Sequence, residues 1–93
     1  MTNPFLIMKD VERLYKIPRG SLTIRSYDWL VNEAKCVAQY VCYNKLKMTQ
    51  KDIGDAFLVS KSCVCYNLSK LDKIIAKKDK GVAWALRNLP NRR

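Results

Sequence analysis

The sequence predicts an all-α fold, a compact domain of about five helices that contains a helix-turn-helix. Apolar residues recur every three or four positions through most of the chain, which is the period of a helix with one buried face. No segment shows the alternation of a strand. Two helical segments with their own candidate N-caps, Thr49 and Ser60, are separated by only about three residues. At 93 residues, we expect a single domain, 1–93.

The helices before the motif are predicted from the positions of proline residues, from candidate capping residues and from the helical spacing of apolar residues. Pro4 suits the first turn of an opening helix, and Pro18 ends that helix no later than Ile17. We expect residues 18–22 to form a turn or a single helical turn, and residues 23–27 to form an irregular loop. Asp28 or Ser26 can cap the next helix, which we expect to be the central core helix. Its buried positions should be Val31, Ala34, Val37, Ala38, Val41, Cys42 and Leu46.

The predicted helix-turn-helix occupies residues 49–77. Ile53, Ala56 and Phe57 form the apolar face of its first helix, and Gly54 lies where a side chain would hold the two helices apart. Leu58 stands where a glycine is usual in such turns, so a left-handed backbone there would be strained. The second helix should bury Val64, Leu68, Leu71 and Ile75.

A last short helix should follow the motif. Either Gly81 breaks the preceding helix or Asp79 caps this last one. Val82, Leu86 and Leu89 would pack back on the core, and Pro90 would end the helix.

The charge of the chain favours a nucleic-acid partner. The net charge is +10. Residues 1–44 hold six basic and four acidic side chains, a net charge of +2, whereas residues 45–93 hold twelve and four, a net charge of +8. The positive field therefore concentrates on the half that contains the motif, where it would attract phosphates without regard to sequence.

The sequence offers little support for a metal-binding protein, an enzyme or a membrane protein. The four cysteines show no Cys-x-x-Cys spacing and the chain has no histidine, so we expect reduced thiols, no metal and no cofactor. The sequence has neither paired carboxylates nor a phosphate-binding loop, so we expect neither an enzyme nor a small-molecule substrate. Without a membrane-spanning run, a signal peptide or a strongly hydrophobic basic amphipathic helix, the chain should be cytoplasmic and bind no membrane.

The second helix of the motif should read double-stranded DNA. Its expected outer face is polar or basic and carries no carboxylate, as a helix in a major groove requires. The predicted base contacts are Lys61, Ser62, Cys63, Tyr66 and Asn67. The predicted phosphate or minor-groove contacts are Arg25, Gln50, Lys51, Ser60, Lys70 and Lys73. Trp29, Tyr40 and Tyr43 are expected at the edge of the core, with a stacking platform for single-stranded bases as the alternative.

The order of elements resembles the C-terminal DNA-binding domain (domain IV) of the bacterial replication initiator DnaA, a Trp-repressor-like helix-turn-helix. The sharpest match is Ile53-Gly54-Asp55-Ala56-Phe57, and Val37-Ala38, Val41, Val64 and Lys70-Leu71 also fit. The resemblance runs from about Leu6 to Leu89. Of the family's Asp-His-Thr-Thr-Val signature, only Val64 is kept in the segment Ser60–Val64. The ATPase module of the initiator has no counterpart, because no Gly-x-x-x-x-Gly-Lys-Ser/Thr motif occurs.

The resemblance implies a stand-alone DNA-binding protein in transcription or replication control, on a phage or other mobile element in one interpretation. A lone helix-turn-helix reads few base pairs, so a homodimer or a protein partner is a further expectation. The alternative is a protein-interaction module that binds a host or replication protein.

Overall fold

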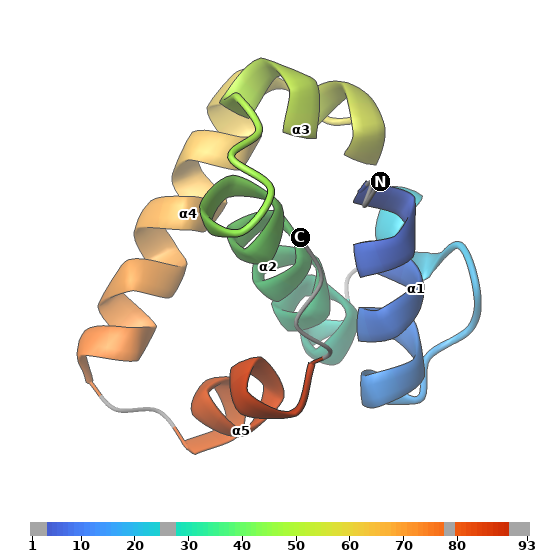
Figure 1. Cartoon of the computed structure of the whole chain (residues 1–93), viewed down its shortest axis with the longest axis vertical. Coiled ribbons are helices and arrows are strands. Elements are labelled where there is room, and N and C mark those ends of the chain that lie inside the picture. The colour runs from blue at the N-terminus through green and yellow to red at the C-terminus, as the bar shows by residue number, and fades with distance from the viewer. Residues whose placement is uncertain (1–3, 25–27, 78–79, 90–93) are drawn as a thin grey trace.

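Helix α2 (Trp29–Asn44) is the centre of the computed structural model, because every other helix packs against it (Figure 1). The structure describes residues 4–24, 28–77 and 80–89. Six of the seven positions predicted to be buried in this segment lie in the helix and are buried, from Val31 to Cys42. The seventh, Leu46, follows the end of the helix and is half-buried against the core.

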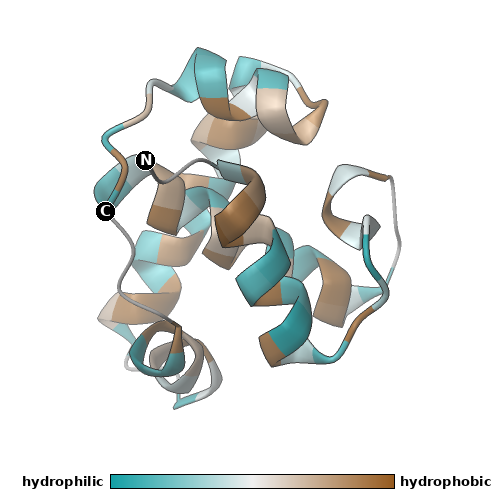
Figure 2. Ribbon diagram, turned by 45° about the vertical axis from the view of Figure 1, so that its right-hand side comes forward, coloured by the Kyte–Doolittle hydropathy of each residue, from teal (hydrophilic) through white to brown (hydrophobic). Residues whose placement is uncertain are grey.

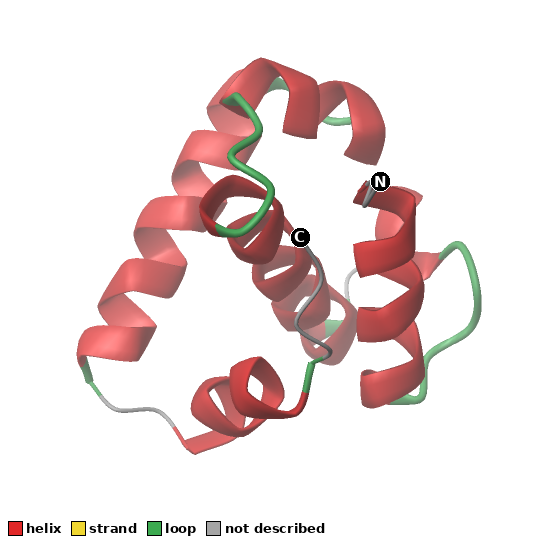
Figure 3. Ribbon diagram, viewed as in Figure 1, coloured by secondary structure: helices red, strands yellow, loops and turns green. Residues whose placement is uncertain are grey.

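Four further helices and one short 3-10 helix surround α2. They are α1 (Pro4–Tyr15), η1 (Ser21–Thr23), α3 (Gln50–Phe57), α4 (Lys61–Ala76) and α5 (Lys80–Asn88). Figure 1 places α1 and α4 on opposite sides of α2, with α5 below. All regular structure in residues 4–24, 28–77 and 80–89 is helical (Figure 3), which confirms the all-α prediction.

The core is apolar and continuous from α1 to α5. Figure 2 shows apolar and polar residues alternating along each helix, as helices with one buried side require. The largest fully buried side chains include Phe57, Leu22, Ile53 and Leu71. Leu22 belongs to η1, a single helical turn that overlaps the end of the region 18–22, where the sequence predicted a turn or a single helical turn.

The helix boundaries follow the local signals in the sequence. Asp28 Oδ1 accepts from Leu30 N at 2.9 Å, Thr49 Oγ1 from Asp52 N at 3.1 Å and Ser60 Oγ from Cys63 N at 3.1 Å. Each cap thereby satisfies one of the backbone donors that a helix start leaves without a partner. Helix α1 ends at Tyr15, before Pro18, as predicted.

The position of the last helix tests the prediction that Gly81 breaks the preceding helix. Helix α4 ends at Ala76, and Gly81 lies inside α5 as its second residue, so Gly81 does not break the preceding helix. The proposed cap Asp79 lies outside the described residues. Val82 is fully buried, and Leu86 and Leu89 are half-buried against the core.

The turn between α3 and α4 is as tight as the sequence predicts. Leu58 ends α3 in a left-handed conformation, with φ 59° and ψ 40°. The backbone N–H groups of Leu58 and Val59 both donate to the carbonyl of Gly54. A Cβ atom at Gly54 would lie 2.7 Å from the carbonyl oxygen of Val59, so only glycine lets the chain fold back this closely.

The aromatic side chains predicted at the core edge divide into two kinds. Tyr40 is half-buried against the core, as expected. Trp29 is 72% exposed and Tyr43 is 42% exposed. Trp29 is the first residue of α2, where the helix borders an open notch rather than a packed neighbour.

None of the helices in the described part of the chain is both long and apolar enough to cross a membrane.

We expect Gly54→Ala to destabilise the fold. The new methyl group would collide with the Val59 carbonyl, and overpacking of this kind costs about 1–3 kcal/mol, partly offset by the better helix propensity of alanine. Urea denaturation followed by circular dichroism measures the change in the free energy of unfolding. Gly81→Ala, in an exposed position of α5, is the matched control and should be neutral or stabilising. Equal effects of the two substitutions would contradict the steric account.

We expect Leu58→Gly to stabilise the fold by about 0.5–1 kcal/mol, because relief of the left-handed strain exceeds the extra chain entropy of glycine in the unfolded state. Leu58 is 74% exposed, so little packing is lost. The control is Lys51→Gly in the exposed part of α3, which should destabilise the protein by about 1 kcal/mol. Thermal melts of both variants show whether each substitution raises or lowers the stability. A loss of stability in Leu58→Gly would contradict the idea that Leu58 is strained.

Candidate nucleic-acid interface

The exposed face of α4 is polar and basic, as the sequence predicts. Val64, Leu68 and Leu71 turn one side of the helix into the core. The exposed residues of its first four turns are Lys61, Ser62, Cys65, Tyr66, Ser69, Lys70, Asp72 and Lys73. The helical period places Ser62, Tyr66, Ser69 and Lys73 directly opposite the buried stripe. Asp72 lies to one side of that line, so the outermost face of α4 carries no carboxylate.

Tyr66 is the most prominent side chain on this face. It is 67% exposed, one of the large hydrophobic side chains that the fold leaves in solvent. A tyrosine in the middle of a lysine-bearing helix face offers both an apolar ring and a hydroxyl. The structure therefore leaves Tyr66 accessible, as a base contact would require.

Asn67 and Cys63 occupy a different place from the other predicted base contacts, Lys61, Ser62 and Tyr66. Asn67 Nδ2 donates to Gln39 Oε1 of α2 at 2.9 Å, and Cys63 Sγ lies 3.8 Å from the same nitrogen. Both Cys63 and Asn67 are half-buried, on the flank of α4 that faces α2. In this arrangement the Asn67 side-chain amide ties the two helices together, and a contact with a base would require it to leave Gln39.

Gln39 makes this contact unusual. Its side chain is fully buried, and its Nε2 has no hydrogen-bond partner among the residues that the structure describes. Burying an amide whose N–H donors are unused costs free energy. Asn67 satisfies only the amide oxygen of Gln39. The Gln39–Asn67 pair is therefore a partly buried polar link between α2 and α4.

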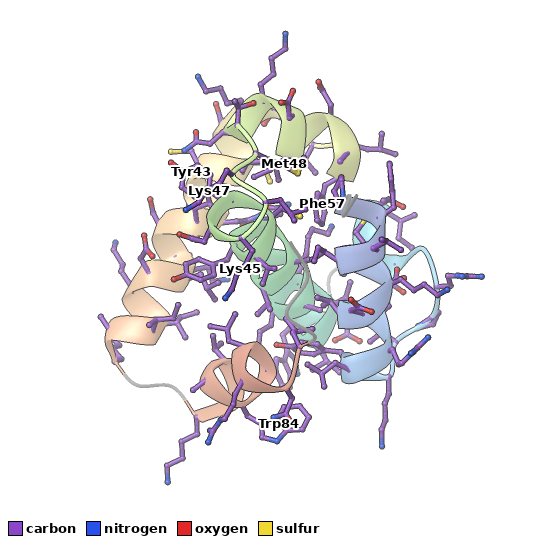
Figure 4. All side chains as sticks on the ribbon, in the orientation of Figure 1. Tyr43, Lys45, Lys47, Met48, Phe57 and Trp84 are labelled. Atoms are coloured by element: carbon purple, nitrogen blue, oxygen red, sulfur yellow. The ribbon has the colours of Figure 1, made fainter. Side chains whose placement is uncertain are left out.

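Lysines gather in a cavity at the starts of α3 and α4. It measures about 630 Å³ and its lining includes Lys47, Gln50, Lys51 and Lys61. Figure 4 labels Lys47 and Tyr43, another lining residue, near the end of α2. The first turn of α3 also borders this cavity, and the N-terminus of a helix favours negative charge. The structure thus brings together three predicted contacts, Gln50, Lys51 and Lys61, around one positively charged hollow.

A second lysine-lined hollow lies along the other end of α4. It measures about 330 Å³ and is lined by Tyr66, Ser69, Lys70, Lys73, Ile74 and Lys77. Lys70 and Lys73 were predicted as phosphate contacts and Tyr66 as a base contact. The two hollows lie toward opposite ends of α4, and the second one includes Tyr66, Ser69 and Lys73 of its outer face.

Sequence reasoning did not name as contacts four residues that belong with these hollows, Tyr43, Lys47, Ser69 and Lys77. Lys47 and Tyr43 precede the Thr49 cap, outside the predicted motif, although a positive charge two residues before a capping residue was a usable signal. Ser69 has the outward helical phase of Tyr66 and Lys73. Ser60 is exposed at the start of α4, as predicted. The predicted minor-groove contact Arg25 lies outside the described residues.

The cysteines occupy two environments. Cys36 and Cys42 are buried in α2, and Cys63 and Cys65 lie in α4, half-buried and exposed respectively. Burial raises the pKa of the Cys42 thiol to about 12. Burial also raises the pKa of the Cys36 thiol, an effect that the positive charge of Lys70 partly opposes. Both core cysteines therefore stay neutral thiols and act as small apolar side chains.

Comparison with known proteins gave no match among protein-family models, curated proteins or solved structures. The resemblance to DnaA domain IV therefore stays a prediction from the sequence.

We expect Asn67→Ala to destabilise the protein by about 1–2 kcal/mol, because it leaves the buried Gln39 amide without any partner. Chemical denaturation without DNA measures the change. The control is Ser69→Ala on the exposed outer face, which should change stability by less than about 0.5 kcal/mol. A stability of Asn67→Ala equal to the unaltered protein would mean that the pair with Gln39 contributes nothing.

Proposed function

We propose that this protein binds double-stranded DNA, with the outer face of α4 in the major groove and the lysines at its two ends on the flanking phosphates. The observation that carries the proposal is the distribution of charge along α4. Lysines line a hollow at each end of the helix, whereas the outermost positions between them, Ser62, Tyr66 and Ser69, are uncharged.

The dimensions support this arrangement. At about 1.5 Å per residue, the rise from Lys61 to Lys73 is about 18 Å. The major groove is about 12 Å wide and admits an α-helix, so with the middle of α4 against the base edges, the lysines near its two ends would lie close to the phosphates that border the groove. Phosphate contacts would set affinity and orientation, and the central face would supply any sequence preference.

The rest of the interface follows from the two hollows. Lys47 and Lys51 would hold one backbone together with the first turn of α3, and Lys70, Lys73 and Lys77 the other. Lys61, predicted from the sequence as a base contact, lines the first hollow, and we propose that it contacts a phosphate instead. Tyr66 would contact a thymine methyl group or a base edge from the middle of the face. In biological terms we infer a role in transcription or replication control.

We expect the affinity for duplex DNA to fall steeply with salt, with a log–log slope near −5 to −7 if about five to eight phosphates are neutralised. Lys61→Glu should lower the affinity at least about tenfold and make the slope shallower by about 1–2, because it removes one phosphate contact and introduces a repulsive charge. Fluorescence anisotropy of a labelled duplex at several salt concentrations measures both.

The matched control is Lys9→Glu, which changes the net charge equally at an exposed position of α1, on the opposite side of α2 from α4 (Figure 1). Its effect should be several-fold smaller than that of Lys61→Glu. Equal losses in the two variants would mean that only the overall charge matters and that α4 is not the binding face. Absence of duplex binding at low salt would refute the proposal and favour a protein partner.

A further inference from the structure

A notch at the start of α2 adjoins the second lysine hollow and has a different chemistry. It measures about 270 Å³, and its lining includes Trp29, Asn32 and Glu33 of α2. On the α4 side it is lined by Lys70 and Ile74, which also line the second hollow. The notch therefore continues the proposed DNA-binding surface from α4 onto α2.

Trp29 gives the notch an accessible aromatic ring. Its side chain is 72% exposed although tryptophan gains more than most residues from burial. Aromatic rings next to basic residues are the platforms on which proteins stack unpaired bases, and such stacking does not depend strongly on the base. The ring of Trp29 lies at the notch that Lys70 also lines, so a base and its own phosphate could be held together.

Glu33 distinguishes this notch from a phosphate site. Its carboxylate would repel a phosphate, but it can accept a hydrogen bond from the exocyclic amino group of a base. The Asn32 amide offers both a donor and an acceptor at the same place. A ring for stacking, polar groups for a base edge and one lysine together suit a nucleobase better than backbone.

We infer that the notch binds an unpaired nucleobase next to the duplex that α4 holds. The inference rests on the proposed function and extends it, because a base inside an intact duplex is stacked on its neighbours and cannot offer its face to Trp29. The preferred ligand is thus duplex DNA with a single unpaired base, such as a bulge, rather than a perfect duplex.

Two labelled duplexes that differ only by one bulged base test the inference by fluorescence anisotropy at low salt. We expect the bulged duplex to bind about tenfold more tightly, the effect of one stacked base. Trp29→Ala should abolish this preference and leave the affinity for the perfect duplex within about twofold of the unaltered protein, because it removes only the stacking partner. In the Trp84→Phe variant, the emission of Trp29 should be quenched more by the bulged duplex than by the perfect one.

Trp84→Ala is the matched control, since Trp84 is the other tryptophan, is 51% exposed and belongs to α5. It should keep the preference for the bulged duplex. Equal affinity of the unaltered protein for both duplexes, or a preference that survives Trp29→Ala, would overturn the inference and leave the proposed function standing. Failure to bind either duplex would overturn both.

Discussion

The contact between Gly54 and the Val59 carbonyl governs how α3 and α4 are joined. Because a Cβ at Gly54 would lie 2.7 Å from that oxygen, the chain can reverse within three residues only with glycine at this position. The same turn places Leu58 in a left-handed conformation and leaves Ser60 free to cap α4. The direction of α4, and with it the position of every side chain on its outer face, depends on this close approach.

A polar contact holds the other side of α4. The Gln39–Asn67 pair joins the middle of α4 to the central helix through a partly buried hydrogen bond. Apolar packing alone tolerates small rotations of one helix against another, whereas a hydrogen bond between two side chains has a preferred distance and direction. The turn at Gly54 fixes where α4 begins, and this pair fixes how α4 is rotated about its axis.

The sequence predicted the helices well because their signals are local. The caps at Asp28, Thr49 and Ser60 and the apolar stripes act within one or two turns, so their effect can be read without knowing the fold. The candidate site was predicted less completely. Asn67 contacts Gln39, which is 28 positions away in the sequence. Trp29 is exposed because it borders the notch between α2 and α4. Such features depend on which helices meet, and helical periodicity alone does not determine that.

The residues that carry the resemblance to DnaA domain IV are mainly structural. Ile53 and Phe57 are fully buried, and Gly54 permits the turn, so a chain that folds around this motif needs such residues whatever its outer face binds. The positions that differ from the family, in the segment Ser60–Val64, include the exposed Lys61 and Ser62 at the start of α4. Base edges are read by exposed side chains, not by the core beneath them. On the proposed function, a core that resembles the family's beneath a different outer face would dock on DNA in the same way and read a different sequence.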